Sequence, residues 1–197
     1  SAAPASIRHC RTRASGQRAG EAAAQYARPV KAGSFNEGEL ADEEDSMLGV
    51  FSNPGKENPY MLTEELQNTM QEGAMIARTE EGLTDCLQKI LALQKRSQNL
   101  HVEGSRIYNP GWHTTRDVRN MLTVSEIIVR CALERKESRG AQWRTDYPDP
   151  DPEWGKKMLI ATKGAQGEVD ISTTPLREMS PELAALFEAA KASTETK

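Results

Sequence analysis

The sequence predicts a mainly α-helical protein: a three-helix antiparallel bundle, followed by a small β-hairpin and a short C-terminal helix. Apolar residues recur at helical spacing in three successive stretches between residues 62 and 133. Short connections join these stretches, which favours antiparallel neighbours. Two runs, residues 158–162 and 168–173, flank a turn from Gly164 to Gly167, which is typical of a hairpin.

Residues 1–57 predict a flexible N-terminal segment with one short helix and a linker. Residues 1–17 lack periodicity, so we expect a poorly ordered end. Residues 16–27 predict a short alanine-rich helix that stops near Pro29. Glycines, prolines and an acidic run in residues 31–59 indicate a linker, and the run lacks the spacing of a calcium loop.

Residues 58–150 predict the bundle and a charged docking segment. Thr63 is expected to cap the first helix and Gly73 to end it, while Thr79 caps the second. The third helix is expected from about Thr115 to Ser138. The predicted core-facing residues of the second and third helices are Leu83, Leu87, Ile90, Leu91, Gln94, Val118, Met121, Leu122, Ser125, Ile128, Val129, Ala132 and Leu133.

Residues 151–197 predict the β-hairpin, a short helix and a tail. Pro181 is expected to start the last helix, which runs through Ala190 with Ser180 as its cap. Only 37% of residues are hydrophobic and the mean hydropathy is −0.66. Such a chain either leaves a part unpacked or has its core completed by a partner.

Composition excludes several function classes. A net charge of −4 argues against nucleic-acid binding, because neutralising phosphates needs a basic face. Cys10, Cys86 and Cys131 are far apart and form no zinc motif, which favours buried thiols in a reducing compartment. No apolar run approaches the roughly 20 residues that span a bilayer, and no signal peptide is evident, so no direct membrane insertion is expected.

Common sequence motifs for catalysis and for cofactor binding are also missing from the sequence. There is no glycine-rich phosphate loop, nucleophile elbow or zinc-protease motif, so we predict no catalytic, cofactor-binding or metal-ligating residue. The three histidines are dispersed and are expected at the surface. His113 follows Trp112 and is expected to cap or pack at a helix start.

Charged and aromatic residues are concentrated around the end of the third helix and beyond it, in residues 137–147, here called the docking segment. Arginine forks match carboxylates with paired hydrogen bonds, so Glu137, Arg139, Arg144 and Asp146 are expected to form a charge network. The alternative is a set of exposed ion pairs of little consequence. Buried Trp, Tyr and Arg anchor interfaces, which favours an interface here. The interface candidates are Glu137, Arg139, Trp143, Arg144, Asp146 and Tyr147.

Three strings give the chain a family resemblance. They are Asn-Pro-Gly-Trp-His at 109–113, Asn-Met-Leu-Thr-Val-Ser-Glu at 120–126 and Ala-Leu-Glu-Arg-Lys-Glu-Ser-Arg-Gly at 132–140. The chain resembles the C-terminal helical domain of the succinate dehydrogenase/fumarate reductase flavoprotein subunit, over about residues 16–188. Asp146-Tyr147-Pro148 fits the same pattern, whereas Gln142 stands where that family commonly has a histidine.

The resemblance implies a role without catalysis by this chain alone. FAD would sit in another domain of the parent subunit, where succinate and fumarate are interconverted. The helical domain would pack against that flavin-binding domain, and the docking segment would face it or the iron–sulfur subunit. We expect a cytoplasmic chain, either unattached or held at the inner face of the cell membrane through partner subunits. Two alternatives remain: the C-terminal domain of an L-aspartate oxidase, and a stand-alone helical interaction module.

Overall fold

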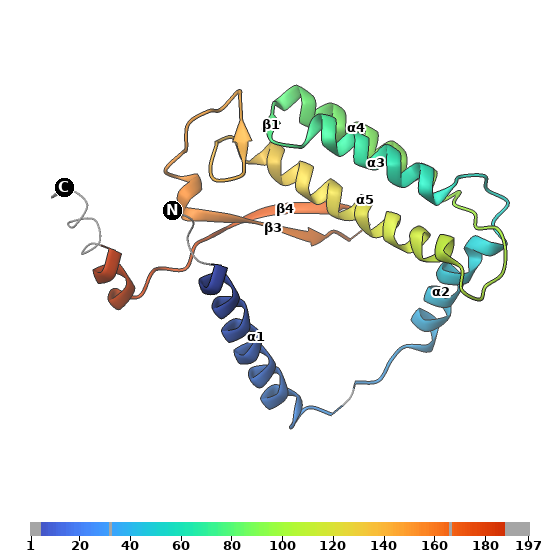
Figure 1. Cartoon of the computed structure of the whole chain (residues 1–197), viewed down its shortest axis with the longest axis horizontal. Helices are drawn as coiled ribbons and strands as arrows, with labels where there is room; N and C mark the ends of the chain where they lie inside the picture. The colour runs from blue at the N-terminus through green and yellow to red at the C-terminus, as the bar shows by residue number, and fades with distance from the viewer. Residues whose placement is uncertain (1–4, 32, 166, 188–197) are drawn as a thin grey trace. The chain divides into compact units, whose positions relative to one another are not determined.

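The computed structural model describes residues 5–31, 33–165 and 167–187, with side chains from residue 15 onward. The chain forms two compact units, Ser1–Ser46 and Met47–Lys197. Figure 1 shows the elements in chain order. They are α1 (Ala5–Ala27), α2 (Glu37–Leu48), the 3-10 turn η1 (Gly49–Phe51), α3 (Pro59–Gly73), β1 (Ala77–Arg78), α4 (Glu80–Ser97), α5 (Pro110–Glu134), β2 (Trp143–Arg144), the 3-10 turn η2 (Trp154–Lys156), β3 (Lys157–Lys163) and β4 (Val169–Pro175).

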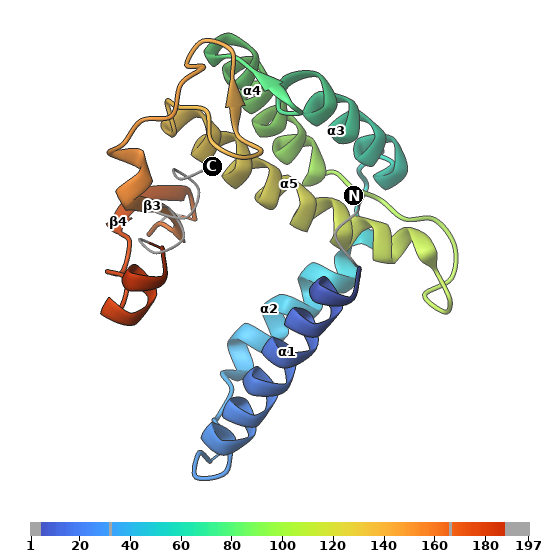
Figure 2. The ribbon, with the colours of Figure 1, turned by 60° about the vertical axis from the view of Figure 1, so that its left-hand side comes forward.

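Helices α3, α4 and α5 form the predicted bundle and lie side by side in both views (Figures 1 and 2). The first residues of α3 and α5 line one cavity, so these two helices start at the same end and α4 runs antiparallel to both. Their amphipathic faces meet in a single apolar core. The buried core residues are Leu62, Leu66, Ala74, Leu83, Cys86, Ile90, Leu93, Leu100, Val118, Leu122, Val129 and Ala132.

The predicted core faces are largely confirmed, but Leu91 and Ile128 lie outside the core cluster, and Leu93 is buried in place of Leu91. Ile90, Val118 and Val129 are fully buried, and Leu87 packs at the margin of the core. Ile128 was expected inside and is 41% exposed. It lies one residue before Val129, so it is rotated about 100° away from the core on the helix.

Two helices are capped by residues that the sequence pattern did not single out. Asn58 and Asn109 accept hydrogen bonds from the backbone N–H groups of Tyr60 and Trp112, and a proline follows each cap. The predicted starts at Thr63 and Thr115 are therefore wrong by about one turn, because proline at the first helical position stabilises a helix start. Thr79 caps α4 as predicted, accepting from the Gly82 N–H group.

The hairpin is confirmed as an antiparallel pair in which Lys157 faces Pro175 and Lys163 faces Val169. Contacts with α5 place it against the bundle (Figure 2). Ser180 caps the terminal helix as predicted, with its Oγ accepting from the Leu183 N–H group at 3.4 Å. Residues 181–187 are helical, and the predicted extension to Ala190 lies outside the described residues.

The N-terminal region contains more helix than the sequence pattern suggested. Helix α1 begins at Ala5, where a flexible end was expected, because alanine and arginine favour helix even without an amphipathic pattern. Helix α2 occupies part of the predicted linker, and Glu37 and Glu39 lie favourably at its positive end. The predicted three-part division at residues 57/58 and 150/151 stays a prediction.

Helix α5 ends at Glu134, earlier than the expected Ser138, and the chain then turns back toward α4. Arg139 and Gln142 exchange two backbone hydrogen bonds around Gly140, whose φ of +60° favours glycine. The strand β2 then pairs with β1 in parallel, so that Arg78 faces Arg144. This two-residue pairing fixes the docking segment to the bundle.

Candidate functional site: the docking segment

Arg144 is the centre of the docking segment and its side chain is fully buried. Its Nε and one terminal nitrogen donate to the two carboxylate oxygens of Asp146, each at 2.8 Å. The same terminal nitrogen donates to Glu80 Oε2 at 2.8 Å. The side-chain bonds raise the pKa of Arg144 and lower the pKa of Asp146, so both groups are charged.

The Arg144–Asp146 pair also joins two helix ends. The other terminal nitrogen of Arg144 donates to the Ala132 carbonyl at 2.8 Å, near the C-terminus of α5. Asp146 Oδ2 accepts from the Glu80 N–H group at 2.8 Å, at the N-terminus of α4. The cation therefore lies at a negative helix end and the anion at a positive one, and both satisfy backbone groups that the helices leave unpaired.

A second cluster surrounds Glu137, whose side chain is also fully buried. It accepts from Arg135 Nε at 2.7 Å, from Arg139 at 3.0 Å and from the Asp151 N–H group at 2.8 Å. Burial opposes ionisation, but the hydrogen bonds from Arg139 and Arg135 prevail and lower the pKa of Glu137 to about 2. The cluster ties the end of α5 to the chain that leads into the hairpin.

Gln142 links the two sides of the segment. Its Oε1 accepts a hydrogen bond from Arg78, and its Nε2 donates to the Ala132 and Arg135 carbonyls at 3.3 and 3.4 Å. An amide can donate and accept at once without changing its charge. At this position Gln142 thus acts as an uncharged bridge between β1 and the end of α5.

Aromatic rings cover the charged groups. The Tyr147 ring centroid lies 5.0 Å from the Arg144 guanidinium and 5.9 Å from Lys136 Nζ. The Trp154 ring is contacted by Arg135 at 5.6 Å and by Lys157 at 4.1 Å. These distances fit cation–π contacts. Trp143, by contrast, is 48% exposed.

The structure divides the six predicted interface residues into two groups. Glu137 and Arg144 are fully buried within the chain, so their side chains cannot reach a partner, and the expected single charge network is two separate clusters. Arg139, Trp143 and Tyr147 are exposed at the surface; Asp146 is exposed as well, but both of its carboxylate oxygens are bonded to Arg144. The candidates accessible to a partner are therefore Arg139, Trp143 and Tyr147.

Three contributors were missed at the sequence level: Glu80, Arg135 and Arg78. Glu80 lies in the first turn of α4 and pairs with Arg144 from there. Arg135 follows the last helical residue and bonds Glu137 and the Trp154 carbonyl. A cationic residue at a helix end is a signal that could have pointed to it.

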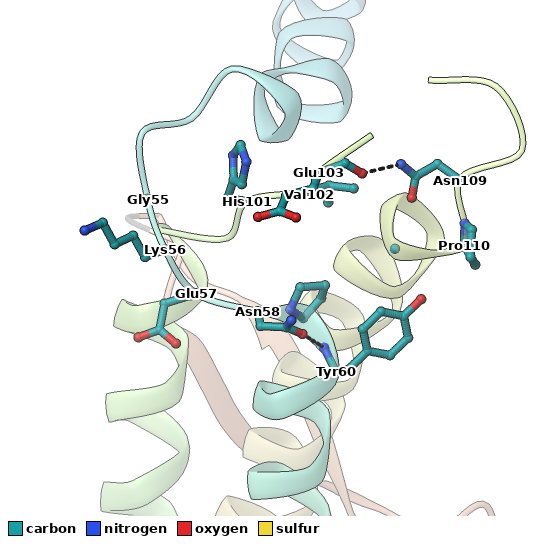
Figure 3. A pocket seen from close by; sticks show the side chains of 12 residues that line it. Gly55, Lys56, Glu57, Asn58, Tyr60, His101, Val102, Glu103, Asn109 and Pro110 are labelled. Carbon is teal, nitrogen blue, oxygen red and sulfur yellow. Dashed lines mark hydrogen bonds between the residues drawn. The ribbon is translucent and has the colours of Figure 1, made fainter. Parts of the chain in front are cut away.

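A separate cavity of about 400 Å³ lies at the opposite end of the bundle, where α3 and α5 begin (Figure 3). The Asn58 side chain caps Tyr60 there, and Asn109 Nδ2 donates to the Glu103 carbonyl at 2.9 Å. His101 Nδ1 lies 2.8 Å from the Asn53 carbonyl oxygen. These polar groups serve the helix caps and the adjoining loop, so we assign the cavity no ligand.

The described residues offer neither a metal site nor a membrane-spanning helix. Among them, no group of three or more His, Cys, Asp and Glu side chains is arranged to hold a metal ion. No helix within the described ranges is both long and apolar enough to cross a membrane.

Known proteins match this chain over most of its length. The family model for the fumarate reductase flavoprotein C-terminus matches residues 63–188. The solved structure of Mycobacterium smegmatis Sdh1 in complex with UQ1 superposes with a TM-score of 0.78 at 37% identity, over 90% of this chain and 31% of that chain. The Helicobacter pylori (strain 26695) fumarate reductase flavoprotein subunit is 31% identical over 71% of this chain and 20% of its own length.

The relatives also include a different enzyme. The L-aspartate oxidase of Vibrio cholerae is 35% identical over 50% of this chain and 18% of its own length. The chain spans less than a third of the length of each of these relatives. The family model covers well over half of the chain, and the fold agrees with it. The chain belongs to the fumarate reductase flavoprotein C-terminal family.

Proposed function

We propose that this chain is the C-terminal helical domain of a flavin-dependent oxidoreductase of the succinate/fumarate type. The match of residues 63–188 to the family model carries the proposal. The parent subunit would interconvert succinate and fumarate, and this chain would support that subunit without catalysing the reaction alone.

FAD is proposed to sit in the parent subunit, outside this chain. Dinucleotides are commonly bound where a parallel sheet meets the N-terminus of a helix through a glycine-rich turn. The described strands form only two separate pairs, and no glycine-rich turn leads from either pair into a helix. The described residues therefore do not fit FAD, and we derive no step of the reaction through it.

The docking segment is proposed to contact the flavin-binding domain or the iron–sulfur subunit. The buried clusters around Arg144 and Glu137 hold the segment in one conformation before any partner arrives. Arg139, Trp143 and Tyr147 remain exposed upon it. A preorganised surface loses little conformational entropy on binding, and Trp, Tyr and Arg are the residues that most often anchor interfaces.

Co-purification tests the proposal directly. The chain, tagged, would be expressed alone and together with a neighbouring reading frame that encodes a flavin-binding domain. We expect a flavin absorbance spectrum only in the co-expressed complex. The Arg139→Ala variant should recover less partner than wild type, while Arg130→Ala, an arginine of α5 that pairs with Glu126, serves as the matched control. A chain that binds added FAD alone and reduces fumarate would refute the proposal.

The aspartate oxidase relative defines the second candidate. The purified complex would be assayed with succinate and with L-aspartate as electron donors. Oxidation of L-aspartate, with no iron–sulfur subunit in the complex, would favour this candidate. Failure of any flavin-binding domain to associate would instead favour a stand-alone interaction module.

A further inference from the structure

We propose that the terminal helix, residues 181–187, folds back over the outward face of the β-hairpin and covers it as an intramolecular cap. The proposal concerns two apolar surfaces of the second compact unit. It is independent of the flavoprotein assignment, because it involves only segments of this chain.

The first surface is one face of the terminal helix. Leu183, Leu186 and Phe187 are between 51% and 66% exposed, and Met179 just before the helix is 53% exposed. Leu183, Leu186 and Phe187 recur at i, i+3 and i+4, which places them on one face of the helix, and Met179 lies in the connection that precedes it. A cluster of large exposed apolar side chains marks a surface that is normally covered.

The second surface is the outward face of the hairpin. Val169 and Ile171 of β4 line a hollow with residues of α4 and α5, so the face that they share with Leu159 and Ala161 is turned toward the bundle. Side chains alternate between the two faces of a strand. Met158 and Ile160 therefore point away from the bundle, and they are 41% and 39% exposed.

The connection has the length that this contact needs. The Leu176 N–H group donates to the Lys156 carbonyl at 2.7 Å, so the chain is still anchored beside the first residues of β3 at that point. Only residues 177–180 separate this anchor from the helix. Four extended residues reach roughly 13 Å, and packed layers of secondary structure lie on the order of 10 Å apart. The helix can therefore reach Met158 and Ile160.

The charges favour a protein surface over a lipid surface as the occupant. Helices that lie on membranes are rich in lysine and arginine on their polar face. Residues 177–187 instead carry one arginine and two glutamates, Arg177, Glu178 and Glu182. Leu183, Leu186 and Phe187 pack against no apolar surface in the part of the chain that the structure describes. The outward face of the hairpin offers them the apolar side chains of Met158 and Ile160.

Methionine oxidation of the intact chain, at low protein concentration, tests the proposal. Oxidation by peroxide depends on exposure of the sulfur, so a covered methionine reacts more slowly. Met158 and Met179 report on the proposed contact. Met61 of α3 and Met75 after α3 are 60% and 49% exposed in the structure and serve as internal references.

If the helix covers the hairpin, Met158 and Met179 should oxidise about fivefold or more slowly than Met61 and Met75. Leu186→Asp should remove this protection. Ala185→Asp is the matched control, because it adds the same charge on the opposite face of the helix, and it should leave the protection intact. Equal oxidation of all four methionines in the wild-type chain would overturn the proposal. So would protection that survives Leu186→Asp, or protection that appears only with phospholipid vesicles or at high protein concentration.

Discussion

Replacing Arg144 by alanine is the sharpest test of how the docking segment is held. The side chain is fully buried and bonds Asp146, Glu80 and the Ala132 carbonyl. Its removal leaves the carboxylates of Asp146 and Glu80 without the guanidinium that they share. The Ala132 carbonyl keeps only the 3.3 Å hydrogen bond from Gln142. Removal of one partner of a buried ion pair costs about 3–5 kcal/mol of unfolding free energy.

For Arg144→Ala we expect a loss of unfolding free energy at the lower end of this range of about 3–5 kcal/mol. The Asp146 and Glu80 side chains are 28% and 50% exposed, so water can solvate part of the charge that Arg144 leaves behind. We expect Arg144→Ala to lower the free energy of unfolding by about 3 kcal/mol, which corresponds to a fall in Tm of roughly 6–12 °C for a chain of this length.

Urea denaturation followed by circular dichroism at 222 nm would measure the loss. Lys89→Ala is a suitable control, because that lysine forms exposed ion pairs with Asp85 and Glu72 on the surface of the bundle. The control should cost less than about 1 kcal/mol. A loss below about 1 kcal/mol for Arg144→Ala would show that the ion pair does not fasten the segment, and would refute the reasoning.

Three further predictions concern the other parts of the structure. Arg139→Ala should lower the melting temperature moderately, because Arg135 and the Asp151 N–H group still bond the buried Glu137, and it should weaken partner binding in a pull-down assay by a larger factor; equal losses in both would contradict a docking role. Ile90→Ala should cost about 2–5 kcal/mol in urea denaturation because the residue is fully buried, whereas Ile128→Ala should cost less than about 1.5 kcal/mol because it is partly exposed. The folded-state pKa of Glu137 lies below its ordinary value of 4.5, at about 2, so its contribution to stability is complete above pH 4.5 and is lost as the pH falls toward 2. Glu137→Gln should therefore flatten the pH dependence of stability across that window, and an unchanged profile would show that other groups control it.

Local sequence signals predicted the parts of the fold that depend on neighbouring residues. Thr79 was identified as a helix cap because its partner, the Gly82 N–H group, lies three residues away. The hairpin was identified from two short runs and a glycine-containing turn. Asn58 and Asn109 were missed because the helix starts were expected at the later Thr63 and Thr115, although an asparagine followed by a proline also suits a helix start.

Long-range contacts explain what the sequence could not predict. Arg144 was expected at an interface because of its charge and its aromatic neighbours, but Glu80, 64 residues away, helps to bury it. The pairing of β1 with β2 involves only two residues of each strand, so it leaves no periodic pattern. The location of the docking segment was thus predictable, while the division between its buried and exposed side chains needed the structure.

The central claim is that the docking segment presents its exposed side chains to a flavin-binding partner. Titration calorimetry of the chain with that partner domain tests the claim most directly, with wild type compared against Trp143→Ala and Tyr60→Ala. Both residues are about half exposed, but Tyr60 lies at the opposite end of the bundle. We expect Trp143→Ala to weaken binding by at least about tenfold and Tyr60→Ala to bind like wild type. Equal affinity of all three proteins would contradict the claim.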